Sequence, residues 1–90
     1  METKENVLGT RKYLLISVAG REILTEQFDT LENAQKTMHE ELIQWGHIPE
    51  ECLKQKEYED EFGNFGFGEY GGWANRGLNN ADYDWSIVEL

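Results

Sequence analysis

Residues that can act as nucleophiles or general bases are present, but none lies in a sequence setting that would activate it. Cys52 directly follows Glu50 and Glu51, and neighbouring carboxylates oppose formation of the reactive thiolate. His39 is followed by two glutamates and is expected to be solvated, while Ser17 lies inside a predicted strand without the exposed turn that a nucleophile needs. We therefore expect a protein without enzymatic activity. A small carboxylate- or metal-dependent hydrolase is the alternative.

Metal and cofactor motifs are also missing from the sequence. His39 and His47 are too far apart for the close ligand pairs of a zinc site, and Cys52 follows without a partner. The segment Gly66–Gly71 matches G-x-G-x-x-G, but the residues after it begin a helix poorly, and a dinucleotide fingerprint needs that helix. No cofactor and no metal are predicted.

An acidic run in the second half of the chain is the strongest candidate for a binding site. Glu57, Glu59, Asp60 and Glu61 surround Tyr58, so four charges fall within five residues. In an extended segment at about 3.3 Å per residue this gives about one charge per 4 Å, close to the spacing along a DNA strand. The run is thus predicted to bind a basic protein surface, or to mimic nucleic acid there. A solvated face without a partner is the alternative.

Aromatic residues are divided between a predicted core and a predicted interface. Trp45 and Trp85 belong to apolar patterns and are both expected to be buried. Tyr70 and Trp73 lie in a glycine-rich stretch before a polar loop and are expected to be exposed partner-binding residues. The alternative for Trp73 is a third buried tryptophan of the core. We expect the small residues of this stretch to let an aromatic ring from a neighbouring element lie across the strand.

Composition restricts the class of partner and the compartment. The 90 residues carry a formal charge of −10, and residues 46–90 hold ten acidic residues against three basic ones. Such a charge repels nucleic acid and anionic membranes and attracts basic surfaces. No apolar run approaches the roughly 18 residues of a membrane span. The single cysteine cannot form an internal disulfide, so we expect a cytoplasmic protein.

The first half of the sequence predicts a hairpin and a helix. Residues 1–10 are expected to form a polar leader and residues 11–90 a single domain. Strands are predicted over 13–18 and 22–28, joined through Gly20 and Arg21 in a type II′ turn. Asp29 or Thr30 is expected to cap a helix that ends at Gly46. Its apolar stripe consists of Leu31, Ala34, Met38, Leu42 and Trp45.

The second half is expected to add a short helix and two strands. Pro49 and the two glutamates after it favour a helix start, with an end near residues 62–64. One glycine-rich strand is predicted over 65–73, a loop over 75–82, and a last strand over 83–90 with Trp85 on its buried face. The predicted fold class is α+β, a small antiparallel sheet in the order β-β-α-(α)-β-β with a helix packed on one face.

In length, charge and element order the chain resembles small acidic proteins of bacterial phages and mobile elements. The helix entry Phe28-Asp29-Thr30-Leu31-Glu32-Asn33-Ala34 and the ending Tyr83-Asp84-Trp85-Ser86-Ile87-Val88 carry a further resemblance to small bacterial domains. Some such proteins, the anti-CRISPR proteins among them, inhibit nucleic-acid-processing machinery. The resemblance implies a fold and transfers no functional residue.

These observations favour a protein-binding module, in the most specific form an inhibitor whose acidic surface occupies a basic nucleic-acid-binding site on its partner. The expected partner is a basic protein, with a nucleic-acid-processing complex as the class that the charge pattern fits. Direct nucleic-acid binding and membrane binding are not expected. An accessory domain that forms a homodimer is the remaining alternative.

Overall fold

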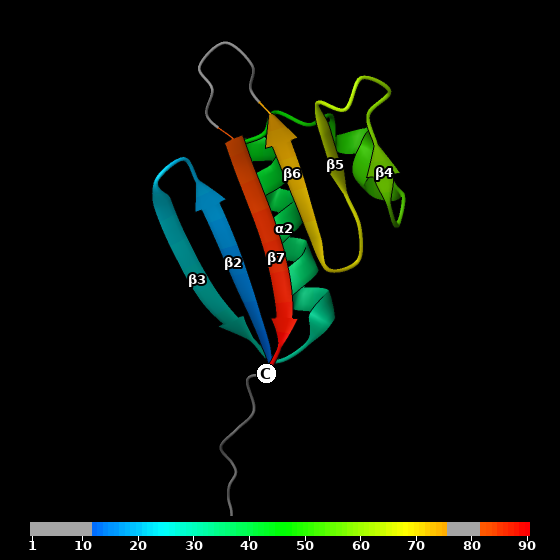
Figure 1. The fold of residues 1–90 in the computed structure, drawn as a ribbon. Coiled ribbons are helices and arrows are strands. Elements are labelled where there is room, and N and C mark those ends of the chain that lie inside the picture. Colours follow the sequence, from blue (N-terminus) through cyan, green and yellow to red (C-terminus); the bar gives the residue numbers. More distant parts are fainter. Residues whose placement is uncertain (1–11, 76–81) are drawn as a thin grey trace, which may run out of the picture.

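One antiparallel sheet of six strands forms the frame of the protein, and a long helix packs on one of its faces (Figure 1). The computed structural model describes residues 12–75 and 82–90, so the predicted leader over 1–10 lies outside the described residues. The strand order is β3-β2-β7-β6-β5-β4. The strands are β2 (Tyr13–Ala19), β3 (Glu22–Phe28), β4 (Tyr58–Glu59), β5 (Phe65–Phe67), β6 (Gly71–Asn75) and β7 (Asp82–Glu89). The predicted α+β class is confirmed.

The first hairpin, β2–β3, forms where the sequence predicts it. Ala19 pairs with Glu22, so Gly20 and Arg21 make a two-residue turn. Gly20 has a φ of 64°, whereas Arg21 is not among the described residues with positive φ. This combination is what a type II′ turn requires, because only its first central position needs a left-handed backbone.

The helix α2 (Leu31–Gln44) begins at Thr30, whose hydroxyl accepts the N–H of Asn33 at 3.1 Å. Thr30 is therefore the cap, and the alternative cap at Asp29 is wrong. Gly46 follows the C-cap residue Trp45, as predicted, but it does not have the left-handed backbone of a glycine cap. The left-handed residue is His47, with a φ of 56°, and Gly46 is needed for another reason. A Cβ on Gly46 would come within 2.7 Å of the Leu42 carbonyl oxygen and 3.0 Å of Ala74 Cβ.

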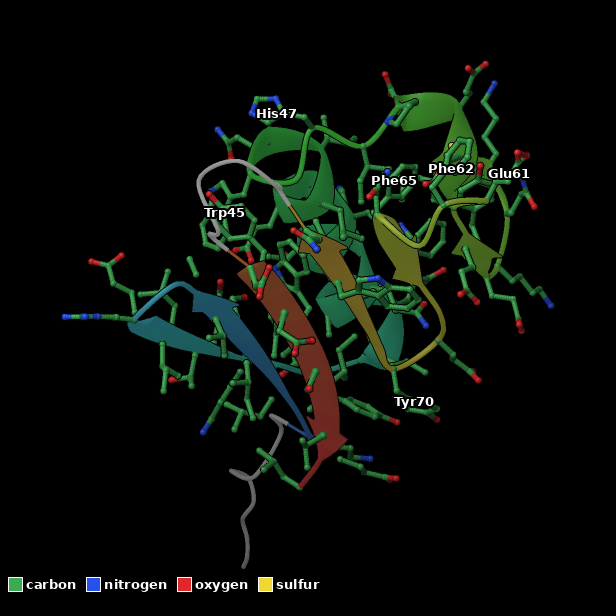
Figure 2. The ribbon with its side chains drawn as sticks, turned by 45° about the horizontal axis from the view of Figure 1, so that its top comes forward. Trp45, His47, Glu61, Phe62, Phe65 and Tyr70 are labelled. Carbon is green, nitrogen blue, oxygen red and sulfur yellow. The ribbon has the colours of Figure 1, made fainter. Side chains whose placement is uncertain are left out.

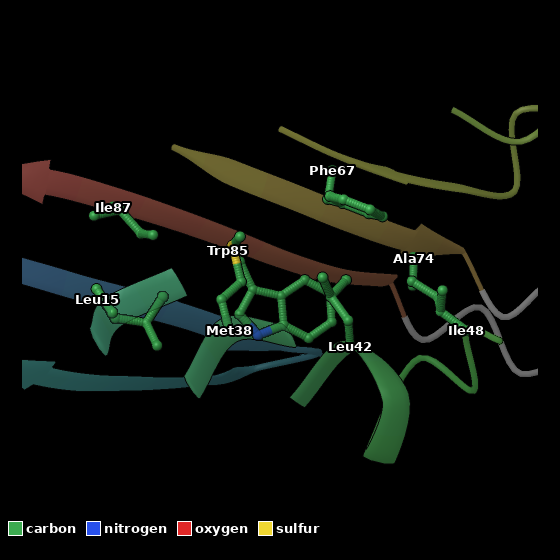
Figure 3. Close-up of a cluster of buried hydrophobic side chains, with 9 residues drawn as sticks. Leu15, Met38, Leu42, Ile48, Phe67, Ala74, Trp85 and Ile87 are labelled. Carbon is green, nitrogen blue, oxygen red and sulfur yellow. The ribbon is translucent and has the colours of Figure 1, made fainter. Parts of the chain in front are cut away.

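The core lies between α2 and the sheet (Figure 3). Ala34, Met38 and Leu42 are fully buried, which confirms the centre of the predicted stripe. Trp85 is 2% exposed, as predicted, but Trp45 is only half-buried because it follows the last helical turn. From the strands and the segment after α2, the buried side chains are Leu15, Ser17, Ile48, Phe67, Ala74, Trp85 and Ile87.

The middle of the chain departs most from its predicted structure. The second helix is only a 3-10 helix, η1 (Glu50–Lys54), and the chain then enters the sheet as the edge strand β4. The predicted single strand over 65–73 is two strands, β5 and β6, joined through residues 68–70. The loop predicted over 75–82 begins and ends in strand residues, and 76–81 lie outside the described residues. No described helix is long and apolar enough to cross a membrane.

The second face of the sheet has no helix on it within the described residues (Figure 1). Strand alternation directs to this face the side chains that neighbour the core residues, such as Val18 beside Ser17 and Asp84 beside Trp85. We call it the open face. Its apolar side chains are exposed or half-buried: Leu14, Ile16, Val18, Ile23, Trp73 and Val88.

Candidate functional site

The acidic run lies at the edge of the sheet and divides its side chains between two faces. Tyr58 points to the helix side, where its ring stacks on Phe65 and Phe67 at centroid distances of 5.6 and 6.4 Å. Glu59 pairs with Gly66 and therefore lies on the open face. Glu57 and Glu59 are both exposed. The tyrosine thus anchors the strand, and the glutamates remain in solvent.

Asp60 and Glu61 have different positions although they are neighbours. Asp60 Oδ2 accepts the backbone N–H groups of Phe62 at 3.1 Å and Asn64 at 3.4 Å, so this carboxylate holds the β4–β5 turn. Glu61 lies exposed at the tip of that turn beside Phe62 (Figure 2), whose side chain is 80% exposed. The four charges therefore follow a strand and then a turn, and do not continue along one extended line.

Trp73 lies in the middle of β6, and its side chain is on the open face. The ring lies across the neighbouring strand at Gly66, where an added Cβ would come within 2.5 Å of Cζ2 and 2.8 Å of Cζ3. A small residue of this stretch thus does let an aromatic ring lie across it, but the ring belongs to Trp73 of the same stretch and not to an element outside it. With 37% of its surface exposed, Trp73 is neither a buried core residue nor a residue at the mouth of a loop.

One cross-strand row runs through Trp73 from edge to edge of the open face. Trp73 pairs with Asp84 on β7 and with Gly66 on β5. In sheet order the row is Ile23, Val18, Asp84, Trp73, Gly66 and Glu59. The row is apolar at the β3 edge, and it carries an indole between two carboxylates in its other half.

Two shallow hollows meet at Trp73, and each has acidic residues in its wall. Glu57 and Glu59 line the hollow toward β4. Asp82 and Asp84 line the hollow toward β7. Three of the predicted partner-binding residues, Glu57, Glu59 and Trp73, thus come together, and Tyr58 contributes to the wall from the other face.

Tyr70 does not join this group. It lies in the β5–β6 turn at the opposite end of the sheet from Glu61 (Figure 2) and is 51% exposed. The pKa of Tyr70 is raised, chiefly by the charge of the adjacent Glu69 and then by loss of solvent. The pKa of Tyr58 is also raised, chiefly by Cys52 beside it. At neutral pH both hydroxyls therefore keep their protons and are neutral donors.

The sequence prediction missed several exposed residues of this surface. Asp82 and Asp84 were not predicted to bind a partner, although the alternation that buries Trp85 places both on the opposite face. Val18 and Ile23 were expected only as strand residues, and Ile23 is 66% exposed. Phe62 was assigned to the end of a helix. Alternation alone identifies the first four as open-face residues once the hairpin is assigned.

The residues with catalytic potential lie on the helix side. Ser17 is buried, and its hydroxyl donates to Glu41 Oε1 at 2.6 Å, an oxygen that also accepts Trp85 Nε1–H at 2.9 Å. His39 is half-buried, so its predicted solvation is wrong. It packs edge-on against Phe67 at 5.4 Å, and burial lowers its pKa.

A hollow of about 370 Å³ beside His39 is lined by side chains of both charges, among them Lys54, Lys56, Glu57 and Glu69. No group of three histidine, cysteine, aspartate or glutamate side chains within the described ranges is arranged to hold a metal ion.

In comparisons with known proteins, no protein-family model, no curated protein and no solved structure matched the chain. The resemblance to small acidic phage and mobile-element proteins therefore stays a prediction, and the geometry of the open face carries the functional argument.

Proposed function

We propose that this chain is a non-enzymatic protein-binding module that docks the open face and the acidic β4 edge of its sheet on a basic surface of a partner protein. The observation that carries the proposal is the cross-strand row in which the exposed Trp73 lies between Asp84 and Glu59. In its most specific form, the module is an inhibitor that occupies a nucleic-acid-binding site of the partner.

The apolar part of the open face supports a protein partner. Ile23 is 66% exposed and Val88 44%, and both lie on the same face as Val18 and Ile16. Contiguous apolar side chains on an uncovered sheet face are characteristic of interaction sites in soluble proteins. An exposed tryptophan beside them adds the residue type most enriched among binding hot spots.

The charge of the chain selects a basic partner. The formal net charge is −10, and every charged residue that lines the two hollows at Trp73 is acidic. Complementary charge accelerates association and disfavours like-charged partners, which include nucleic acid and a second copy of this chain. A homodimer through the apolar part of the open face is the alternative that the same surface leaves open.

The experiment is affinity capture with identification of the partner, followed by binding measurements with two purified variants and the unchanged protein. Charge reversal of Glu57, Glu59 and Glu61 to lysine should weaken binding at least several-fold while the protein stays folded. The matched control reverses Glu22, Glu26 and Glu32, which are equally exposed but lie on β3 and at the start of α2. This control should bind nearly as the unchanged protein does.

Salt dependence provides the second readout. Between about 50 and 300 mM salt the affinity should fall several-fold, mainly through slower association, since the Debye length shrinks in this range. Equal affinities for both charge-reversed variants, or a partner that is itself acidic, would refute the proposal. Turnover of generic ester or phosphate substrates would favour the hydrolase, and a concentration-dependent dimer would favour the accessory domain.

A further inference from the structure

The acidic residues beside Trp73 have defined positions relative to its indole ring. The indole extends from β6 over β5, so Asp84 lies one strand spacing, about 4.8 Å, beyond its Cα end. Glu59 lies one strand spacing beyond its ring end, because it pairs with the Gly66 that the ring covers. Two carboxylates therefore flank one aromatic ring along a single line.

Neither carboxylate has a partner in the part of the chain that the structure describes. Within residues 12–75 and 82–90, no hydrogen bond or ion pair involves the side chain of Asp84 or Glu59. Asp60 is different, because the β4–β5 turn already uses it. The ring itself lies down on the sheet and keeps 37% of its surface exposed, so its outer side faces solvent.

We propose that Trp73, Asp84 and Glu59 together receive one arginine side chain of the basic partner. A guanidinium is planar, stacks on an aromatic face and is weakly hydrated. Its five donors point outward in its own plane, so a guanidinium stacked on the indole directs N–H groups toward carboxylates at both ends. Lysine has a compact, strongly hydrated charge and cannot stack while it bridges both ends.

This inference rests on the proposed function and specifies the group that the partner inserts. It also explains why the ring lies over a glycine: a side chain at position 66 would lift the indole away from the sheet. In that position the ring would no longer lie between the two carboxylates.

The test uses nuclear magnetic resonance of the ¹⁵N-labelled protein, with a blocked tetra-arginine peptide as the probe and tetra-lysine as its matched control. Three tryptophan indole N–H signals are available as reporters. We expect the Trp73 signal to shift on addition of the arginine peptide, while the buried Trp85 signal stays in place. The lysine peptide should bind at least about 5-fold more weakly.

Variants separate the site from general electrostatics. Asp84→Asn and Glu59→Gln should each weaken arginine-peptide binding several-fold, and Trp73→Leu should weaken it about 10-fold. Glu22→Gln removes the same charge at the distant β3 edge and should change the affinity less than 2-fold. If Trp73→Leu does not fold, the two carboxylate variants still test the site, because both residues are exposed and their replacement should leave the fold intact.

Equal affinity for the two peptides, or equal losses with Glu22→Gln and Glu59→Gln, would overturn the arginine site and leave the basic partner of the proposed function standing. Failure of the arginine peptide to bind at all would overturn the inference as well. The proposed function fails on a separate result, namely an unaltered partner affinity after reversal of Glu57, Glu59 and Glu61.

Discussion

Replacement of Gly66 by alanine should reveal in solution whether Trp73 lies across β5. The three atoms nearest to an added Cβ at this position all belong to the Trp73 ring. Gly66 has no positive φ, so the backbone accepts alanine without strain. The steric effect of the added methyl group therefore depends on the position of the indole.

The magnitude follows from the area that the ring loses. A buried tryptophan contributes up to about 250 Å², and lifting its six-membered ring from the strand re-exposes on the order of 40–60 Å². At about 25 cal/mol per Å² this costs about 1–1.5 kcal/mol. Alanine in place of glycine inside a strand raises the free energy of unfolding by about 0.5–1 kcal/mol, because the unfolded chain is less flexible.

Gly66→Ala should therefore change the free energy of unfolding of the otherwise unchanged protein by less than about 1 kcal/mol, in the destabilising direction. In a Trp73→Ala background the obstacle is gone, and the same change should stabilise by about 0.5–1 kcal/mol. The expected coupling between the two positions is about 1–1.5 kcal/mol, larger than the error of additivity at independent sites.

The assay is a double-mutant cycle by urea unfolding, in which a single domain of this size is expected to unfold in two states. Gly68→Ala is the matched control, because nothing lies within 4 Å of a Cβ added there, and it should add to Trp73→Ala without coupling. Additivity of Gly66→Ala and Trp73→Ala within about 0.5 kcal/mol would show that the ring does not lie on β5.

Three further predictions concern the core and the titration of His39. Trp85→Ala should cost about 3–5 kcal/mol in urea unfolding, and Trp45→Ala clearly less, because Trp45 is half-buried; equal costs would contradict the assigned burial. Glu41→Ala leaves a buried serine hydroxyl without its acceptor and should cost about 1–3 kcal/mol, whereas Glu40→Ala on the exposed side should cost less than about 0.5 kcal/mol. Burial lowers the pKa of His39, so the unfolded state binds the proton more readily. The contribution of His39 to stability is full above about pH 6.5 and is lost as the pH falls from that value through the lower pKa of the folded state. Melting temperatures should therefore fall more steeply with acid than in His39→Gln, and parallel curves would contradict this.

Elements with a local pattern could be predicted from the sequence. The stripe through Ala34, Met38 and Leu42 repeats with the helical period, and these three residues are the buried residues of α2. The β2–β3 hairpin depends on Gly20, which can adopt the left-handed conformation that its turn requires. The alternation of β7 likewise identified Trp85 as buried. In each case the deciding interactions lie within a few residues along the chain.

The acidic segment could not be predicted in the same way. Pro49 and its neighbours favour a helix, but stacking of Tyr58 on Phe65 and Phe67 draws the segment into the sheet. This contact forms across a turn that Asp60 organises, and periodicity in the segment itself does not indicate it. Tertiary packing thus overrides a local preference that is worth only a few tenths of a kcal/mol per residue.

The candidate site depends on non-local pairing even more strongly. Glu59 was singled out for its charge and Trp73 for its glycine-rich setting, but their relation through Gly66 requires the registers of three strands. Asp84 enters the site through a fourth strand. A single sequence determines which face each side chain occupies, but it does not determine which residues become neighbours across strands.

The position of β7 has a consequence for how the protein acquires its structure. This strand lies between β2 and β6, so it joins the hairpin from residues 13–28 to the three strands from residues 58–75. Its pairing brings together residues that are far apart along the chain, such as Tyr13 and Glu89. The ribosome synthesises residues 82–90 after all the other described strands, so until then the sheet is two separate pieces, each with an unpaired inner edge. Closing so long a loop is entropically costly and slow. During synthesis the nascent chain thus exposes the inner edges of β2 and β6, and a chaperone or an unwanted strand can pair with either of them.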